Sequence, residues 1–341
     1  MVERIRRFPV GKLPMEVLAR QLNRNRIFDK RVLVGPAIGE DAAVIDTGGP
    51  RYLIAKTDPI TFTIDRIGWY AVHVNANDIA TLGGQPKWFL ATLLLPESET
   101  GERDVEEIFD QIMETCQGLG ISLIGGHTEI TYDLHRPIVV GQMLGEVERE
   151  KLIRKSGARR GDALLLTKGI AVEGTAIIAR EKEKELVGIF GERFLSRAKD
   201  FIYQPGISVV KDASVAMAAG RIHSMHDPTE GGIATAVHEI THAADLGAVI
   251  DAETVVIFPE TKALCNHYHL DPLGLIASGA LLIAAEASEA PQVKARLEKE
   301  GIATSIIGQL VDRSQGIKLR RGSAIQDLPL FEQDELTKIL R

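Results

Sequence analysis

Apolar residues recur along the first half of the chain in two spacings, one typical of helices and one typical of strands. Helical spacing predicts helices over residues 13–23, 69–82 and 104–118, and the second of these stops at Gly83-Gly84. Short apolar runs bounded by turn residues predict strands over residues 42–46, 51–58, 88–96, 121–126 and 138–147. Helices and strands therefore alternate, as they do in α/β and α+β domains.

The second half of the chain resumes this alternation after a charged, glycine-bearing stretch at residues 148–162. We place a domain boundary in that stretch, which divides the chain into residues 1–150 and 151–341. Strands are predicted over residues 163–169, 253–260, 279–285 and 304–310, and helices over residues 172–199, 208–219 and 289–300. A further helix is predicted to begin at Thr229 or Glu230 and to contain residues 236–245. The fold class predicted from the pattern is α/β (α+β) with two domains.

Composition excludes several classes of protein. The 341 residues are 45% hydrophobic and 26% charged, which is enough apolar material for two packed cores. A net charge of −7 argues against a partner of nucleic acid, because such binding needs cationic contacts to phosphate. The chain has two cysteines, no apolar run of about 18 residues and no apolar segment after its charged start. These features predict a cytoplasmic protein without a disulfide framework or a membrane span.

Three aspartates stand beside glycines or at the ends of predicted elements. Asp41 follows Gly39-Glu40, Asp58 ends a predicted strand, and Asp78 lies inside an apolar helix. Each one alone is explained as a cap or turn residue. A carboxylate on an apolar helix face, however, costs free energy unless it is paired or binds a cation. Together the three favour a site for Mg²⁺ with phosphates, because Mg²⁺ prefers hard oxygen ligands.

Two glycine-rich segments are candidates for backbone contacts to phosphate. Gly125-Gly126 follow a predicted strand, and their N–H groups could approach an anion, although a plain turn explains them equally well. Gly231-Gly232 precede a predicted helix whose N-terminus could cradle an anion, and a simple N-cap is the alternative. A Walker loop and a Rossmann glycine pattern are both absent, so a nucleotide would have to bind in another way.

The segment His238-Glu239-x-x-His242 matches the pattern of zinc proteases, with two His one helical turn apart. A zinc protease also needs a third ligand, and Asp245 stands where the extended form of the motif requires Gly. Glu253 and Glu260 follow in a stretch predicted as a strand. We therefore interpret the match as accidental and expect no catalytic zinc at the two His.

Five segments, taken in order, resemble the AIR synthase (PurM) superfamily. They are GEDAAVID, KTDP, VNANDIATLGGQP, LIGGHTEIT and MHDPTEGGIATAVHEI, and together they extend over nearly the whole chain. The last segment is most similar to the HypE-like branch, whose members act in hydrogenase maturation. The resemblance implies a homodimer of PurM-like chains, each with an N-terminal domain that binds ATP and Mg²⁺ and a C-terminal α/β domain.

The resemblance also assigns roles to individual residues of this chain. The positions matched to Mg²⁺ are Asp41, Asp58 and Asp78, and Glu129 is assigned to the metal as a substitute ligand. The positions matched to the nucleotide are Lys12, Asp41, Asn77, Gly125, Gly126, His127 and Thr128. The positions matched to catalysis are Asp58, Asp78, Asp227 and Glu230, the last two beside the acceptor.

Two departures from the family pattern affect these assignments. His127 stands where the family has an acidic residue, and neutral imidazole is a poor ligand for Mg²⁺. Either Glu129 substitutes, or one metal is lost, or His127 contacts phosphate. In addition, the HypE-like branch carries a cysteine in its C-terminal tail, whereas no cysteine follows Cys265 here. Carbamoyl chemistry on a tail cysteine of the same chain is therefore not expected.

The resemblance implies an ATP-dependent enzyme that phosphorylates or dehydrates a small carbonyl or carbamoyl-type acceptor. Two alternatives stay open, a small-molecule kinase like thiamine-monophosphate kinase and a nucleotide-binding scaffold dimer with reduced catalysis. A maturation protein is the expected macromolecular partner besides a second copy of the chain. Neither nucleic acid nor a membrane is expected as a partner.

Overall fold

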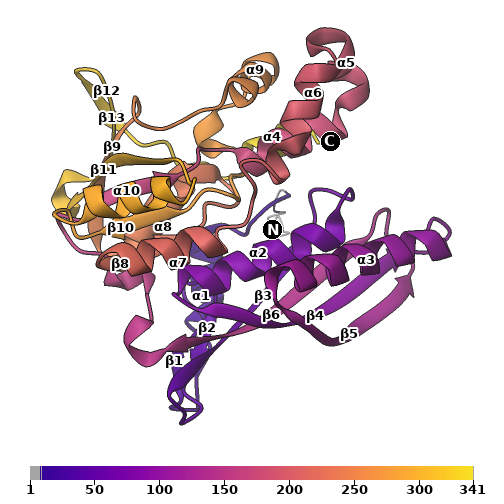
Figure 1. The fold of residues 1–341 in the computed structure, drawn as a ribbon, viewed down its shortest axis with the longest axis horizontal. Coiled ribbons are helices and arrows are strands. Elements are labelled where there is room, and N and C mark those ends of the chain that lie inside the picture. Colours follow the sequence, from indigo (N-terminus) through magenta and orange to yellow (C-terminus); the bar gives the residue numbers. More distant parts are fainter. Residues whose placement is uncertain (1–7, 9, 341) are drawn as a thin grey trace, which may run out of the picture.

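The computed structural model describes residues 8 and 10–340 and consists of two sheets, each covered by helices (Figure 1). The first sheet has six strands in the order β1-β2-β3-β6-β4-β5. Their bounds are Val32–Val34 (β1), Ala43–Ile45 (β2), Arg51–Ile60 (β3), Gln85–Pro96 (β4), Ser122–Thr131 (β5) and Ile138–Glu148 (β6). Strands β4 and β5 are parallel and joined through a helix, whereas β6 pairs antiparallel with both β3 and β4.

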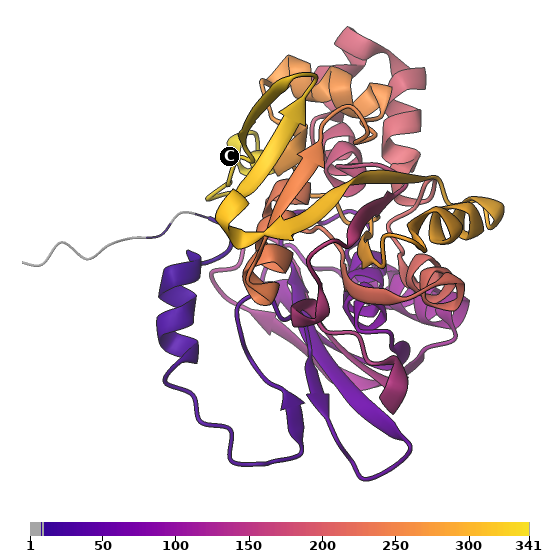
Figure 2. The same cartoon turned by 90° about the vertical axis from the view of Figure 1, so that its left-hand side faces the viewer.

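Two helices, α2 (Ile67–Thr81) and α3 (Glu102–Leu119), cover one face of this sheet. The strands present alternate residues to the helices, so Ile54, Phe89 and Met143 are fully buried in one core with α2. A shorter helix, α1 (Met15–Leu22), precedes the sheet and lies outside its layers (Figure 2).

Helix α2 is buried on nearly all sides because it lies between the first sheet and the C-terminal half of the chain. Its Asn77 side chain joins the two halves. The amide nitrogen donates to Ile207 O at 2.8 Å, and Oδ1 accepts from Val209 N at 2.9 Å. This position explains why the helix is apolar around most of its circumference.

The second sheet has seven strands in the order β13-β12-β9-β11-β7-β10-β8. Their bounds are Ala163–Thr167 (β7), Ile222–His226 (β8), Leu246–Asp251 (β9), Leu282–Ala285 (β10), Thr304–Asp312 (β11), Ile317–Arg321 (β12) and Ala324–Asp327 (β13). The helices of this half are Val172–Glu181 (α4), Glu183–Phe190 (α5), Glu192–Lys199 (α6), Val210–Ala219 (α7), Gly232–Ala244 (α8), Pro259–Tyr268 (α9) and Ala290–Lys299 (α10).

The predicted α/β (α+β) class is confirmed, and three predictions about elements are wrong. Residues 253–260 form no strand; instead α9 begins at Pro259, a residue that is favourable in the first turn of a helix. The predicted helix over 172–199 is three helices, interrupted at Lys182 and at Gly191, whose φ is 80°. The predicted turn at Gly125-Gly126 is part of the continuous strand β5. Among residues 8 and 10–340, no helix is long and apolar enough to cross a membrane.

Candidate active site

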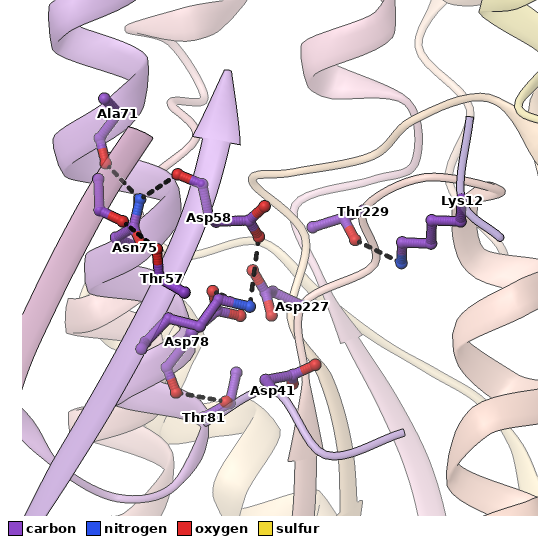
Figure 3. A network of polar contacts seen from close by, with 12 residues as sticks. Lys12, Asp41, Thr57, Asp58, Ala71, Asn75, Asp78, Thr81, Asp227 and Thr229 are labelled. Atoms are coloured by element: carbon purple, nitrogen blue, oxygen red, sulfur yellow. Dashed lines mark hydrogen bonds and ion pairs between the residues drawn. The ribbon is translucent and has the colours of Figure 1, made fainter. Parts of the chain in front are cut away.

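A cavity of about 770 Å³ lies between the two halves of the chain. One wall is formed by the segment from Lys12 to Leu18, the loop at residues 37–41 and the end of β3. The opposite wall is formed by α4, residues 229–239 and residues 330–334. Figure 3 shows Asp41, Asp58, Asp78 and Asp227 grouped in this region, and Lys12 reaching Thr229 from the other side. Four of the carboxylates predicted from the sequence therefore lie in one region of the molecule.

The aspartates of the first domain surround the buried side chain of Lys56. Strand alternation places Lys56 and Asp58 on the same face of β3, and their side chains lie 3.3 Å apart. Asp78 reaches the same lysine from α2 at 3.0 Å. Burial raises the pKa of Asp78 well above its ordinary value, opposed by Lys56. Burial opposes the charge on Lys56, but Asp78, Asp58 and Asp41 together raise its pKa.

A second charged group surrounds His226 at the end of β8. Lys155 Nζ lies 2.6 Å from Asp41 Oδ2 and 3.2 Å from His226 Nε2, and Glu239 Oε2 lies 2.5 Å from the same ring nitrogen. Burial raises the pKa of Asp41, but Lys155, His226 and Lys56 outweigh it and lower the pKa. Burial also raises the pKa of Glu239, but His226 and Lys12 outweigh this effect and lower the pKa to about 2.

Asp227 is the least satisfied carboxylate of the site. It is 1% exposed, and within the described part of the chain neither of its oxygens has a hydrogen-bond partner. Its nearest cationic neighbour is His226, whose Nδ1 lies 3.9 Å away. Burial raises its pKa. Orphaned buried oxygens are costly, so they indicate a missing ligand.

The donor set fits a divalent cation with phosphate oxygens. Asp41, His226 and Asp227 offer ligand atoms within 4.8 Å of one another, and no other such group of three occurs among the residues described. Asp58 and Asp78 add carboxylate oxygens beside them, which suits Mg²⁺ more than a soft metal. The four aspartates, Asp41, Asp58, Asp78 and Asp227, are the residues that would hold Mg²⁺.

Lys12 and the start of α8 occupy the far side of the cavity. Lys12 Nζ lies 3.4 Å from Thr229 Oγ1 and 4.0 Å from Glu239 Oε1, so this lysine faces the cavity as expected. The anion cradle expected at Gly231-Gly232 is occupied by the chain itself. Asp334 Oδ2 accepts a hydrogen bond of 2.7 Å from Gly231 N, and the amide of Gly232 donates to Thr229 O. A carboxylate at a helix N-terminus is electrostatically favourable there.

Several residues predicted for the site do not line the cavity of their own chain. Asn77 is fully buried, and its amide group binds the backbone of residues 207–209 instead of facing the cavity. The residues of β5 that were assigned to nucleotide or metal are exposed on that strand and lie outside the cavity: Gly125, Gly126, His127, Thr128 and Glu129. The reason is the continuous pairing of β5 with β4, which replaces the expected turn.

The three residues of the zinc-protease pattern, His238, Glu239 and His242, lie in three different environments. His238 Nε2 lies 3.2 Å from Leu328 O, and His242, one turn further along α8, is exposed. Glu239 is the member that reaches the cavity, through its contact with His226. No group of three metal ligands that includes His238 or His242 occurs in the described ranges.

Lys56, Lys155, His226 and Glu239 were not identified from the sequence. Two of them had a usable signal. Lys56 stands two positions before Asp58 on a strand, and His226 directly precedes Asp227. Lys155 lies in the charged stretch at residues 148–162, where the domain boundary was placed. The sequence does not distinguish a buried lysine there from the solvent-exposed charged residues around it. The side chain of Lys155 is 5% exposed because it lies between Asp41 of the first domain and His226 at the end of β8.

The sequence matches one protein family in both halves. Residues 39–147 match the AIR synthase related protein, N-terminal domain, and residues 159–319 match the C-terminal domain of the same family. The chain is similar to a putative hydrogenase expression/formation protein of Methanocaldococcus jannaschii, with 27% identity over 85% of this chain and 86% of the relative. It is also 28% identical to the carbamoyl dehydratase HypE of Rhizobium leguminosarum, over 80% of this chain and 77% of the relative.

Other relatives have different names. A selenide, water dikinase of Yersinia pestis is 28% identical over 88% of this chain and 90% of the relative. Among solved structures, a HypE–HypF complex matches with a TM-score of 0.75 at 19% identity, over 92% of this chain and 99% of that chain. HypE in complex with ATP matches with a TM-score of 0.72 at 22% identity, over 89% and 92%. At these identities the solved structures establish a shared fold.

Proposed function

Because the chain belongs to the AIR synthase related protein family, we propose that it is an enzyme that uses Mg-ATP in the cavity between its two domains. The observation that carries this proposal is the grouping of Asp41, Asp58, Asp78 and Asp227 in one region between the two domains. The relatives named as a dehydratase and a dikinase, and the solved HypE bound to ATP, support the use of ATP.

The roles of the chain's own residues follow from their charges. Asp41, Asp58, Asp78 and Asp227 hold Mg²⁺, whose charge stabilises the phosphoryl group in transfer when the metal is bound. Lys56 keeps two of these carboxylates close together by reducing their mutual repulsion. Lys12 reaches into the cavity from the N-terminal segment, where an ammonium group favours phosphate oxygens.

The proposed reaction is phosphorylation or dehydration of a small carbonyl or carbamoyl-type acceptor that enters the cavity. The two cysteines are poor acceptors of a carbamoyl group. Cys116 and Cys265 are both 2% exposed, and burial raises their pKa to about 11 and to about 12. Since the thiolate is the reactive form, the acceptor group is supplied by another molecule.

We also propose that the protein is a homodimer paired over the open face of its first sheet. The strand residues facing away from α2 and α3 include the partly buried Leu53, Leu90, Leu94, Val140 and Leu144. Beside them on β5, Ile124 is 52% exposed. An apolar sheet face of this kind is typical of a subunit interface. In such a dimer the residues of β5 from Gly125 to Glu129 lie at the interface, where they can serve a nucleotide of the partner subunit.

Two further assignments stay proposals. The domain boundary at residues 150/151 falls between the end of β6 and the start of β7, and the matched family domains lie on either side of it.

A maturation protein as a partner is supported by the solved HypE–HypF complex, and co-purification with such a protein would test it.

A product assay with γ-labelled ATP tests the proposed activity. The purified protein with Mg²⁺ is incubated with a panel of carbamoyl compounds, amides and alcohols. We expect release of ADP and labelled phosphate together with a changed acceptor. Transfer of the label to a stable product would favour the kinase alternative. ATP binding without turnover under any condition would favour the scaffold alternative, and failure to bind Mg-ATP at all would contradict the proposal.

A further inference from the structure

Helix α3 carries two rows of solvent-facing side chains that none of the roles above uses. Residues four apart lie along one face of a helix, and the first row is apolar: Val105, Phe109 and Met113. Met113 is 47% exposed, and a shallow groove of about 510 Å³ lies over this row. An apolar groove on the surface is typical of a site that contacts another protein.

The second row is acidic and borders the groove. Its members are also spaced by four residues: Glu102, Glu106, Asp110 and Glu114. Like charges at this spacing destabilise a helix, and within the described part of the chain no cation pairs with any of them. Residues 97–114 include eight acidic side chains and one arginine, so this segment accounts for the net charge of −7 of the whole chain. The groove therefore favours an apolar group that is flanked by cations.

The chain itself presents such a group between α1 and β1. Phe28 is 89% exposed, the highest value among the large apolar side chains described. Its neighbour Ile27 packs on Gly35, where an added Cβ would lie 2.3 Å from Ile27 Cδ1. The segment is thus held to the first domain through Ile27, while the ring of Phe28 stays in solvent.

Exposed cations flank the ring on both sides along the chain: Arg24, Arg26 and Lys30. The one carboxylate of residues 24–31 is Asp29, which Arg31 neutralises at 2.7 Å. The segment therefore combines an aromatic side chain with positive charge, whereas the groove on α3 combines apolar side chains with negative charge. The two surfaces are complementary in both respects.

The two surfaces lie apart within one chain. Residues 24–31 lead into β1, which is one edge of the first sheet, whereas α3 joins β4 to β5, and β5 is the opposite edge. Figure 1 shows β1 and α3 on opposite sides of this domain. A contact between the two surfaces therefore requires a second copy of the chain.

We propose that residues 24–31 of one copy bind α3 of a second copy. The ring of Phe28 enters the apolar groove, and the flanking cations lie against the acidic row. The contact joins different surfaces on the two copies, so it repeats head to tail and adds to the proposed dimer. Its small extent makes it weak, with a dissociation constant of about 10–100 µM. Salt weakens it further, because the charges are exposed.

Sedimentation velocity of the full chain tests the contact, from about 5 to about 200 µM protein and at about 50 and about 500 mM NaCl. We expect the mean sedimentation coefficient to rise with protein concentration at the lower salt concentration, and to rise much less at the higher one. Absence of such a rise in the wild type would overturn the proposal and would leave the groove to a cationic segment of another protein.

Two variants test the two sides of the contact separately. Phe28→Ser removes the ring, and Glu106→Lys combined with Asp110→Lys reverses the charge beside the groove. Each should lower the association constant about tenfold or more. Glu150→Lys combined with Glu192→Lys is the matched control, because it makes the same change in net charge at two exposed carboxylates elsewhere and should leave the association intact.

A charge exchange tests whether the two surfaces contact each other. Adding Arg26→Glu and Lys30→Glu to the chain with Glu106→Lys and Asp110→Lys reverses both surfaces, and this chain should associate like the wild type. The variant residues are exposed, so each variant should fold, and circular dichroism checks this. Binding of Mg-ATP uses other residues and should be the same in every variant.

The proposal is overturned if either surface variant associates like the wild type, or if the charge exchange does not restore association. It is also overturned if Phe28→Ser dissociates the proposed dimer at low protein concentration, because the ring would then belong to the interface of that dimer.

Discussion

At the scale of single residues, the site depends on carboxylates that the protein keeps close together without satisfying all of them. Asp78 and Asp227 are almost completely buried; Asp78 Oδ2 lies 3.0 Å from Lys56 Nζ, whereas neither oxygen of Asp227 has a hydrogen bond among the described residues. Folding alone would disfavour this arrangement, because like charges in a low dielectric repel each other. The arrangement therefore indicates selection for a bound cation.

Replacement of Asp58 by Asn should weaken binding of Mg-ATP by about tenfold or more. The substitution removes one metal-binding charge and leaves the shape of the side chain almost unchanged. The side chain is 35% exposed, so the fold should tolerate the change. Calorimetric titration with Mg-ATP measures the effect. Asp110→Asn on the exposed side of α3 is the control, and equal affinity in the two variants would contradict the assignment.

Asp41 and Asp58 were predictable from the sequence because they stand near glycine or at the end of an apolar run, and Asp78 because it interrupts an apolar helix. The cations between them were not predictable. Lys56 is one of many lysines in the sequence, and only the pairing of β3 with β6 and the position of α2 identify it as buried. Glu239 was assigned to an accidental motif, and its contact with His226 arises from tertiary packing of α8 against β8.

At the scale of elements, helix α2 carries a buried histidine, His73, that makes the stability of the folded chain depend on pH. Burial lowers the pKa of His73 to about 4, from an ordinary value of 6.5. A base with a lowered pKa in the folded state binds fewer protons than the unfolded chain between these two values. Its contribution to stability is therefore complete above pH 6.5 and is lost as pH falls through about 4.

Replacing His73 by Leu should reduce the acid sensitivity of folding. Between pH 7 and pH 5, His73 should lower the free energy of unfolding of the wild type by about 2 kcal/mol. The Leu variant should not show this part of the loss. Urea denaturation at pH 7 and pH 5 measures the difference. Identical pH dependence in the wild type and the variant would show that His73 does not titrate as described.

Glycines at element ends give a second prediction at this scale. Gly232 begins α8 with φ of 60°, and an added Cβ would lie 2.5 Å from Leu273 O. We expect Gly232→Ala to lower the free energy of unfolding by about 1–3 kcal/mol. Gly188→Ala is the control, because Gly188 lies within α5 with open space around it and no positive φ. That change should stabilise the protein by about 0.5–1 kcal/mol in the same denaturation experiment.

Most elements could be predicted from apolar periodicity, but the conformation of glycine pairs could not. Gly83-Gly84 end a helix as expected, whereas Gly125-Gly126 continue a strand. The two glycine pairs differ in whether their backbone pairs with a neighbouring strand. The backbone of residues 125–131 pairs with β4 along its whole length, and no local signal in the sequence reports that pairing.

At the scale of the whole molecule, the resemblance to the AIR synthase superfamily and its HypE-like branch is confirmed, as is the two-domain fold. The five short segments in their order identified the superfamily, whereas any one of them alone is a weak indication. The sequence could not reveal that the β5 residues lie outside the cavity of their own chain, because that depends on the spatial order of the strands.

A charged residue on the open sheet face should weaken the proposed homodimer. Ile124→Glu places a carboxylate among the apolar side chains of β5, where an apolar interface would have to bury it. We expect a shift from dimer to monomer in sedimentation measurements at micromolar concentration. Met113→Glu alters a comparably exposed apolar residue on α3 and should leave the dimer intact. A wild-type chain that sediments as a monomer would contradict the proposed dimer.

The position of the cavity between two domains has a consequence for identifying the unknown acceptor. A molecule that contacts both walls binds only while the domains remain closed on each other, so its binding free energy adds to the stability of the folded chain. A ligand at about one hundred times its dissociation constant adds about 2.7 kcal/mol. Heat-induced unfolding can thus rank candidate acceptors by the rise in melting temperature beyond that given by Mg-ATP, before any product has been identified.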